Sequence, residues 1–387
     1  MLDEPAGRSV RTRMPESLPD VELQELARQL TWHGPDPSAT RFLNVFMDQN
    51  NKCNLRCKMC GFSDSRVSAL PKYDMPRWLF DRIAAEVLPR ANYVCLSLMT
   101  EPFMTRDFPD RLIRVRDAGV PFSEIITNGT LLTEDGCQKI VDARISRVIF
   151  SIDGGTKPVF ESIRVGARFE SVLRNFTMLR DIRDAQQAKI PYLRVNHVLS
   201  EMNVDHFQDV LALTSELRAD EISVRTISRM SNAILQESRD AEFWTKVRAI
   251  KDELRQFCAA TGIRDSGYLR DRHTRIELFT ESGDKLVCPK PWDTLAIHPN
   301  GDAYPCMAWA RPPIGNFGTD TFDVVWNGAP LTRLRSEFVE MAAGVDCLNC
   351  TIRRAGADDP DDDFFFRKLA KTRPSAVAPL DKVVGSA

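Results

Sequence analysis

Short apolar runs alternate with amphipathic stretches between residues 41 and 226. The apolar runs are rich in β-branched residues, as strands buried on both faces are. Six of them lie at Leu43–Asp48, Tyr93–Leu98, Glu124–Thr127, Val148–Ile152, Leu193–Val198 and Glu221–Thr226. Apolar residues at helical spacing mark Arg82–Leu88, Phe108–Ala118, Thr133–Ala143, Phe169–Arg183 and Val204–Leu217. The alternation predicts an α/β fold with a parallel sheet covered by helices, either an open doubly wound sheet or a curved partial barrel.

Polar side chains come directly after the predicted strands. In both types of sheet, the chemistry lies at the carboxyl ends of the strands. A loop with three cysteines follows the first strand, and Glu101, Asn128 and Asp153 follow the next three. We therefore expect these side chains to meet on one rim of the sheet.

Changes in composition divide the chain into five segments, which are 1–40, 41–240, 241–285, 286–355 and 356–387. The first is rich in proline and charge and is expected to be a partly ordered lead-in. The second is the strand–helix domain, and the third is a linker with a long helix at Ala241–Thr261. The fourth has little apolar core but four cysteines, so bound metal is expected to stabilise it. The fifth is acidic and is expected to be mobile.

Overall composition is that of an ordinary globular protein, with 43% hydrophobic and 27% charged residues. The formal net charge is −2, and no basic tract favours nucleic acid or a membrane surface as a partner. There is no apolar run long enough to span a bilayer, and the first residues do not have the pattern of a secretory signal. We expect a cytoplasmic protein.

Seven of the ten cysteines fall into two clusters, which in a reducing compartment favour metal ligation over disulfides. Cys53, Cys57 and Cys60 form the first cluster, with the spacing C-x3-C-x2-C. Three thiolates suit an iron–sulfur cube with one iron left open to a cofactor or substrate. A structural zinc site is the alternative, but it normally needs four ligands, and only Asp64 lies nearby as a fourth.

The loop resembles the signature of radical S-adenosylmethionine (SAM) enzymes, and further segments match that family in order. Thr100-Glu101-Pro102 resembles its glycine–glutamate–proline motif, and Thr127-Asn128-Gly129 resembles a strand-end segment near the cofactor. The resemblance implies a partial (β/α)6 TIM-like barrel for the strand–helix domain. It also implies that S-adenosylmethionine is bound by Glu101, Asn128, Ser151, Asp153, Arg164 and Asn196.

Two of these assignments also make chemical sense by themselves. S-adenosylmethionine carries an ammonium and a carboxylate beside each other. The Glu101 carboxylate suits the ammonium, and the Arg164 guanidinium can bind the carboxylate with a two-pronged fork. For each residue alone, the alternative is an ordinary surface ion pair.

The second cysteine cluster consists of Cys288, Cys306, Cys347 and Cys350. It resembles the auxiliary-cluster extension called SPASM, in its shorter twitch form. Because no cysteine follows Cys350, the resemblance implies one auxiliary [4Fe–4S] cluster with all four irons ligated and an electron-transfer role. Zinc is again the alternative for four cysteines.

The spacing of these four cysteines resembles that of 2-deoxy-scyllo-inosamine dehydrogenases, which oxidise an aminocyclitol alcohol to a ketone. We therefore expect a radical SAM dehydrogenase that acts on a sugar, aminocyclitol or similar small molecule. A flavodoxin, ferredoxin or their reductase would supply electrons. Arg225 or Arg229 is expected to line the substrate pocket.

Three other functions remain open. An epimerase would need a hydrogen-atom donor, for which Cys95 is the candidate because it lies six residues before Glu101 on the predicted strand. A peptide-modifying maturase would commonly have a larger N-terminal recognition domain. A non-catalytic iron–sulfur electron carrier is disfavoured by the three-cysteine loop with Glu101 and Arg164.

Overall fold

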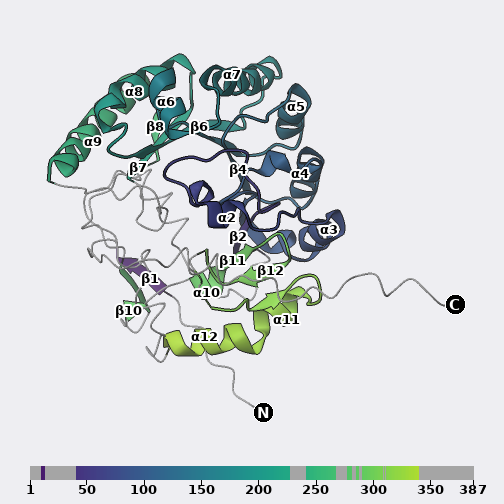
Figure 1. Ribbon diagram of the computed structural model, residues 1–387. Coiled ribbons are helices and arrows are strands. Elements are labelled where there is room, and N and C mark those ends of the chain that lie inside the picture. Colours follow the sequence, from purple (N-terminus) through teal and green to yellow (C-terminus); the bar gives the residue numbers. More distant parts are fainter. Residues whose placement is uncertain are drawn as a thin grey trace, which may run out of the picture.

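A curved sheet lies inside an arc of helices that runs from α3 to α9 (Figure 1). The structure is a computed structural model that describes residues 10–13, 41–226, 241–266, 277–280, 285–286, 290–307, 309 and 311–339. The central strands are β2 (Leu43–Met47), β3 (Ala91–Cys95), β4 (Phe122–Thr127), β5 (Arg147–Ser151), β6 (Tyr192–Leu199) and β7 (Glu221–Thr226). They pair in this order and are all parallel. The predicted α/β fold and TIM-like partial barrel are therefore confirmed.

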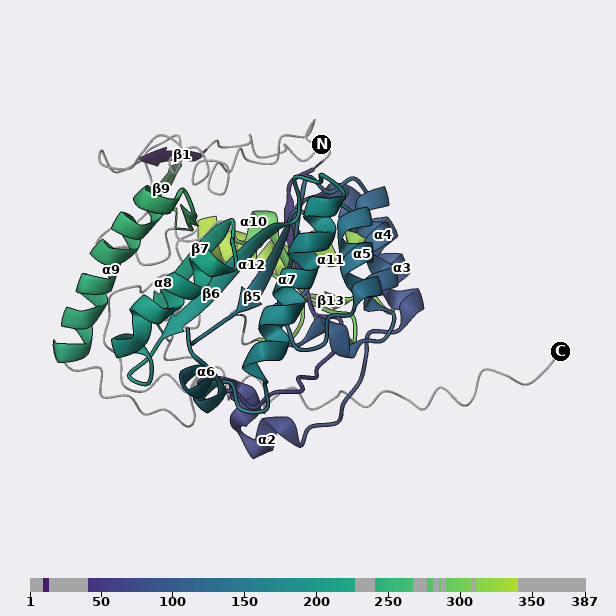
Figure 2. The same ribbon diagram turned by 90° about the horizontal axis from the view of Figure 1, so that it is seen from above.

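Helices connect successive strands and cover the convex face of the sheet, as the view from above shows (Figure 2). They are α3 (Arg77–Glu86), α4 (Phe108–Asp117), α5 (Glu134–Asp142), α6 (Lys157–Ile163), α7 (Phe169–Ala185), α8 (Phe207–Glu216) and α9 (Ala241–Thr261). Alternate strand residues are apolar and point to these helices. Phe150 of β5, for example, packs on Phe176 of α7 with ring centroids 4.7 Å apart.

Local signals explain where the helices begin. Thr133 caps α5 as expected, because its hydroxyl oxygen accepts a hydrogen bond from the N–H of Gly136 at 3.1 Å. The long helix that was predicted at Ala241–Thr261 is α9, with the same bounds.

The third strand is shorter than predicted, because β3 ends at Cys95 instead of Leu98. The Asp48 carboxylate accepts hydrogen bonds from the N–H groups of Leu98 and Met99, at 2.8 and 3.2 Å, so these residues form a loop. The prediction that Cys95 and Glu101 lie on one strand is therefore wrong, and the alternation of side chains does not place them on one face.

Strands from the C-terminal part extend the same sheet. The strand β11 (Thr294–Ile297) pairs in parallel with β2, and β12 (Asp302–Tyr304) and β13 (Gly315–Asn316) follow it at this edge. The strand β8 (Arg264–Asp265) adds to the other edge beside β7. The short helices α10 (Lys290–Asp293), α11 (Phe322–Asn327) and α12 (Ala329–Val339) accompany the C-terminal strands.

A second, three-stranded sheet involves part of the predicted lead-in. The strand β1 (Val10–Arg13) pairs antiparallel with β9 (Glu277–Thr280), which pairs with β10 (Lys285–Leu286). The helical pattern at Val21–Leu30 lies outside the described residues. Among the helices that the structure describes, none is both long and apolar enough to cross a membrane.

Candidate active site

The three-cysteine loop lies between β2 and α3 and is tied to the C-terminal end of α6 and the residues just after it. The N–H groups of Arg56 and Lys58 donate to the carbonyls of Val165 and Ile163, each at 2.9 Å. Burial raises the pKa of Cys53 to about 11 and that of Cys57 to about 12, and it also raises the pKa of Cys60. A negative charge on Cys60 would further disfavour ionisation of Cys53 and Cys57.

This set of thiols fits an iron–sulfur cube. In the described part of the chain, no three His, Cys, Asp or Glu side chains are placed to hold a single metal ion. A [4Fe–4S] cube is normally held by cysteine thiolates on separate iron corners, so three neighbouring cysteines can ligate three of them. Binding would also supply the positive charge that the buried thiolates need.

Glu101 lies close to this loop and is 1% exposed. Its carboxylate accepts hydrogen bonds from the Asn128 N–H at 2.8 Å and from the Thr127 hydroxyl at 2.9 Å. Burial raises its pKa to about 7, although these hydrogen bonds favour the charged form. The side chain of Asn50 fixes the same segment by donating to the carbonyl of Glu101 at 2.9 Å.

Asn128 joins the end of β4 to the cysteine loop. Its side-chain amide lies 3.9 Å from the sulfur of Cys53 and donates to the side-chain oxygen of Asn54 at 2.8 Å. The side-chain oxygen of Asn128 accepts a hydrogen bond from the N–H of Thr130 at 2.9 Å.

Arg164 joins Asp153 to the cysteine loop in a similar way. Its Nε and Nη2 atoms both lie 2.7 Å from Oδ2 of Asp153, and Nη1 lies 3.9 Å from the sulfur of Cys57. The other oxygen of Asp153 accepts from the N–H of Val198 at 2.8 Å. Asp153 is fully buried, so Arg164 balances its charge and lies beside a thiol at the same time.

Ser151 and Asn196 are neighbours across β5 and β6, since they pair in register. The Asn196 side-chain oxygen is buried and has no hydrogen-bond partner. Their predicted contacts with the cofactor stay predictions.

Cys95 and Arg225 lie on other parts of the sheet. The thiol of Cys95 is buried and donates to the carbonyl of Ser97 at 3.0 Å. Burial, with the nearby Glu124 carboxylate, raises its pKa well above the usual range. Arg225 is an exposed residue of β7, in register with Val198. Arg229 lies outside the described residues.

Of the second cysteine cluster, Cys306 follows β12 and is half-buried against the core. Cys288, Cys347 and Cys350 lie outside the described residues.

Asp48 is a site residue that the sequence interpretation did not single out. It is 8% exposed and ends the stretch that was predicted as the first strand. One of its carboxylate oxygens accepts from the N–H groups of Leu98 and Met99 and from the Thr100 hydroxyl, the last at 3.0 Å. Asp48 thereby shapes the segment that leads into Glu101. A carboxylate directly before the cysteine loop was the available signal.

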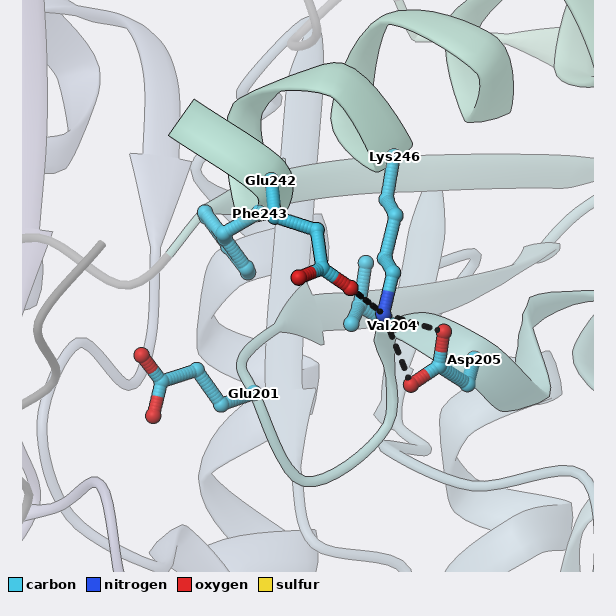
Figure 3. Close-up of a pocket in the computed structure, with 6 residues that line it drawn as sticks. All are labelled: Glu201, Val204, Asp205, Glu242, Phe243 and Lys246. Atoms are coloured by element: carbon cyan, nitrogen blue, oxygen red, sulfur yellow. Dashed lines mark hydrogen bonds and ion pairs between the residues drawn. The ribbon is translucent and has the colours of Figure 1, made fainter. Parts of the chain in front are cut away.

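A pocket beside the start of α9 is separate from these residues (Figure 3). Lys246 reaches into it and forms ion pairs with Asp205 at 2.8 Å and Glu242 at 3.1 Å. Glu201, Val204 and Phe243 complete its lining. None of the predicted cofactor-binding residues lines it.

Comparison with known protein families agrees with this geometry. Residues 50–213 match the radical SAM superfamily, and residues 288–351 match the SPASM iron–sulfur cluster-binding domain. The chain therefore carries a radical SAM domain and a SPASM domain. Its cofactors are [4Fe–4S] clusters and S-adenosylmethionine.

Curated relatives of different activity share part of the chain. A probable GTP 3′,8-cyclase of Metallosphaera sedula is 24% identical over 212 residues, which are 53% of this chain and 63% of that protein. An AdoMet-dependent heme synthase of Methanosarcina barkeri is 29% identical over 170 residues, 43% of this chain and 45% of that protein. The chain thus spans less than two-thirds of the length of these relatives.

Solved structures share the fold at low identity. Native anSMEcpe with bound AdoMet has a TM-score of 0.60 at 17% identity, covering 85% of this chain and 95% of that chain. SuiB of Streptococcus suis bound to S-adenosylmethionine has a TM-score of 0.58 at 16% identity, with coverages of 84% and 73%. SuiB bound to the precursor peptide SuiA has a TM-score of 0.59 at 16% identity, with coverages of 82% and 72%.

Proposed function

We propose that this protein cleaves S-adenosylmethionine reductively and oxidises a sugar, aminocyclitol or similar polar small molecule. The observation that carries the first part is the pair of contacts on the cysteine loop. Asn128, after β4, lies against Cys53, and Arg164, at the end of α6, lies against Cys57, so two separate segments meet the cysteine loop. Bound there, a [4Fe–4S] cluster would supply the electron that converts S-adenosylmethionine to methionine and a 5′-deoxyadenosyl radical.

The chain's own residues would hold the cofactors. Cys53, Cys57 and Cys60 would ligate the first cluster, and Glu101 would bind the ammonium of the methionine moiety. Arg164 would attract the carboxylate, while Asp153 fixes the orientation of the guanidinium. Asn128 and Asp153, with Ser151 and Asn196 on the sheet, would complete the contacts with the cofactor. The loop of residues 98–100, shaped by Asp48, would keep Glu101 in place.

The four C-terminal cysteines support the oxidative outcome. Cys288, Cys306, Cys347 and Cys350 would ligate an auxiliary cluster through all four irons, which suits electron transfer. The adenosyl radical would take the hydrogen atom from a carbinol carbon of the substrate. The hydroxyl proton would then pass to a base and the remaining electron to the auxiliary cluster, which leaves a ketone. Arg225 would line this pocket. A flavodoxin or ferredoxin system would renew the electron at the first cluster.

Epimerisation is a second candidate. The buried Cys95 thiol, which donates to the carbonyl of Ser97, would then have to return a hydrogen atom to the substrate radical. In that case the carbon would be inverted without net oxidation. Exchange of solvent deuterium into the substrate carbon, lost in Cys95→Ala, would identify this outcome.

Product analysis tests the proposal. Reconstituted protein would be incubated with S-adenosylmethionine, dithionite and an aminocyclitol that is deuterated at its carbinol carbons. We expect deuterium in 5′-deoxyadenosine and one ketone for each deuterated nucleoside. Deuterium transfer without a ketone would indicate epimerisation. Transfer only from an added peptide would replace the small-molecule proposal with peptide modification, for which the peptide-bound SuiB structure is a precedent.

Iron content tests the second cluster. The wild-type protein should hold about eight irons after anaerobic reconstitution, and Cys306→Ala should hold about four. About four irons in the wild type would contradict an auxiliary cluster. Cys258→Ala, at a half-buried cysteine of α9, is the matched control.

A further inference from the structure

Polar residues stand side by side on strands β6, β7 and β8. Asn196 of β6 pairs in register with Ser223 of β7. Ser266 directly follows β8, and its N–H donates to the carbonyl of Ile222 at 3.0 Å. This bond continues the register of β7 and β8, so Ser266 lies beside Ser223. We call Asn196, Ser223 and Ser266 the polar row.

The polar row faces away from the covering helices. The residue two positions before each member of the row is charged, and these residues are Arg194, Glu221 and Arg264. Residues two apart share one face of a strand. Glu221 binds Arg194 at 2.7 Å and Arg264 at 2.8 Å, so these three side chains meet on one side. The residues between them, such as Ile222, pack in the core on the other side.

Each member of the row has a buried polar atom with no hydrogen-bond partner. The atoms are Oδ1 of Asn196, Oγ of Ser223 and Oγ of Ser266. Asn196 is 5% exposed and Ser223 is fully buried. Buried polar atoms are nearly always hydrogen-bonded, because water is no longer available to them. Three neighbouring exceptions on one face therefore indicate a ligand that supplies the missing partners.

The adjacent charged residues do not serve this purpose, because they bind one another. Glu221 accepts from Arg147 at 3.2 Å, in addition to its bonds with Arg194 and Arg264. The guanidinium of Arg147 also binds Glu124. The polar row itself is uncharged, with one amide and two hydroxyls. Arg225, two residues after Ser223 on the same strand, already has an interaction of its own. The row can therefore exchange hydrogen bonds with a neutral ligand.

We propose that Ser223 and Ser266 of the polar row bind the hydroxyl groups of an uncharged polyol substrate, such as a cyclitol or sugar, beside the cofactor contact of Asn196. This inference rests on the proposed function and names the residues that select its substrate class. Neighbouring strands lie about 4.8 Å apart, so the row extends over roughly 10 Å, enough to contact several hydroxyls of one ring. A substrate hydroxyl can both donate to and accept from a serine hydroxyl.

Binding of myo-inositol tests the proposal on the reconstituted holoenzyme with S-adenosylmethionine present. Isothermal titration would compare the wild type with Ser223→Ala/Ser266→Ala. We expect the double variant to bind myo-inositol at least tenfold more weakly than the wild type. Ser215→Ala, on the exposed side of α8, should bind it like the wild type. Cyclohexanol, which has the ring but a single hydroxyl, should bind neither protein measurably.

Folding of the variants can be checked separately. Removing an unpaired buried hydroxyl should leave the melting temperature of the ligand-free protein unchanged or slightly higher. Should the double variant not fold, Ser266→Ala alone, at the edge of the sheet, should still weaken binding at least threefold. Equal myo-inositol affinity in wild type and variants would overturn the proposal, as would no binding to the wild type. Lower affinity for S-adenosylmethionine, with myo-inositol affinity kept, would show instead that the row serves the cofactor and would also overturn it.

The proposed function has a different readout. Release of 5′-deoxyadenosine by the wild type, without any polyol, reports on the three-cysteine loop. Release without polyol binding would reject only the polar row, whereas the absence of release would reject the proposed function itself.

Discussion

The carboxylate of Glu101 accepts a hydrogen bond from the backbone N–H of Asn128 at 2.8 Å. The loop after β3 is thereby joined to the end of β4, and Asn128 continues to the sulfur of Cys53 at 3.9 Å. One buried carboxylate thus fixes the positions of two loops next to the three thiols. Burial disfavours the charged form of this carboxylate and raises its pKa to about 7.

The first prediction concerns the pH dependence of stability. The pKa of Glu101 is higher in the folded state than the ordinary 4.5, so the folded state retains a proton that the unfolded state loses. The contribution of Glu101 to the free energy of unfolding is therefore most favourable below about pH 4.5, and it falls as the pH rises to about 7. This contribution changes by about 3 kcal/mol over that pH range, because a difference of one pKa unit corresponds to about 1.36 kcal/mol.

Urea unfolding of the metal-free protein measures this effect. Between pH 4 and pH 8, the unfolding free energy of the wild type should fall by about 3 kcal/mol more than that of Glu101→Gln. Glu216→Gln, at an exposed carboxylate of α8, controls for the loss of any carboxylate. Parallel pH curves for the wild type and Glu101→Gln would show that the carboxylate is not desolvated as the structure implies.

The second prediction concerns the buried pair of Arg164 and Asp153. Replacing Arg164 with Met would leave the fully buried Asp153 carboxylate without its cation, at a cost of about 3–5 kcal/mol in unfolding free energy. Chemical denaturation measures the loss, and adding Asp153→Asn should recover part of it. Lys157→Met removes an exposed partner of Glu170 and should change stability little. A loss no larger than that of Lys157→Met would contradict the buried pair.

The third prediction concerns the contact between Gly155 and α8. A Cβ atom at Gly155 would lie 2.1 Å from the backbone carbon of Asp209, so the helix would have to move. We expect Gly155→Ala to cost about 3 kcal/mol or more, measured by thermal or urea unfolding. Gly136→Ala is the matched control, because its Cβ would come no closer than 3.3 Å to any atom, the Thr133 hydroxyl oxygen, and alanine favours the helix. Similar stability of the two variants would contradict this packing.

Much of the fold follows from the sequence because its strands are buried on both faces. Such strands appear in the sequence as short, nearly continuous apolar runs. Short apolar runs such as Val148–Ile152 have no other stable location than the interior of a covered sheet. Helix boundaries were also predictable where a local signal exists, as at Thr133. The pairing of β11 with β2 was not, because it joins residues that are about 250 positions apart and no local pattern encodes such a contact.

The residues that form the candidate site could be predicted from the sequence better than the contacts between them. The positions of Glu101, Asn128 and Asp153 after successive strands indicated that they share one rim. The pairing of Arg164 with Asp153 was not expected, because spacing along the chain does not show which charges will be desolvated together. For the same reason, spacing along the chain does not show that Ser223 and Ser266 are neighbours, since that depends on the register of β8.

Release of 5′-deoxyadenosine tests the central claim most directly. Dithionite-reduced wild-type protein and the variant with Cys53, Cys57 and Cys60 all replaced by alanine would be incubated with S-adenosylmethionine, and the nucleoside would be quantified by chromatography. We expect release by the wild type and by Cys137→Ala, a buried cysteine of α5 outside both clusters, and none by the triple variant. Release by the triple variant at the wild-type rate, or none by the wild type, would contradict a radical generator at this loop.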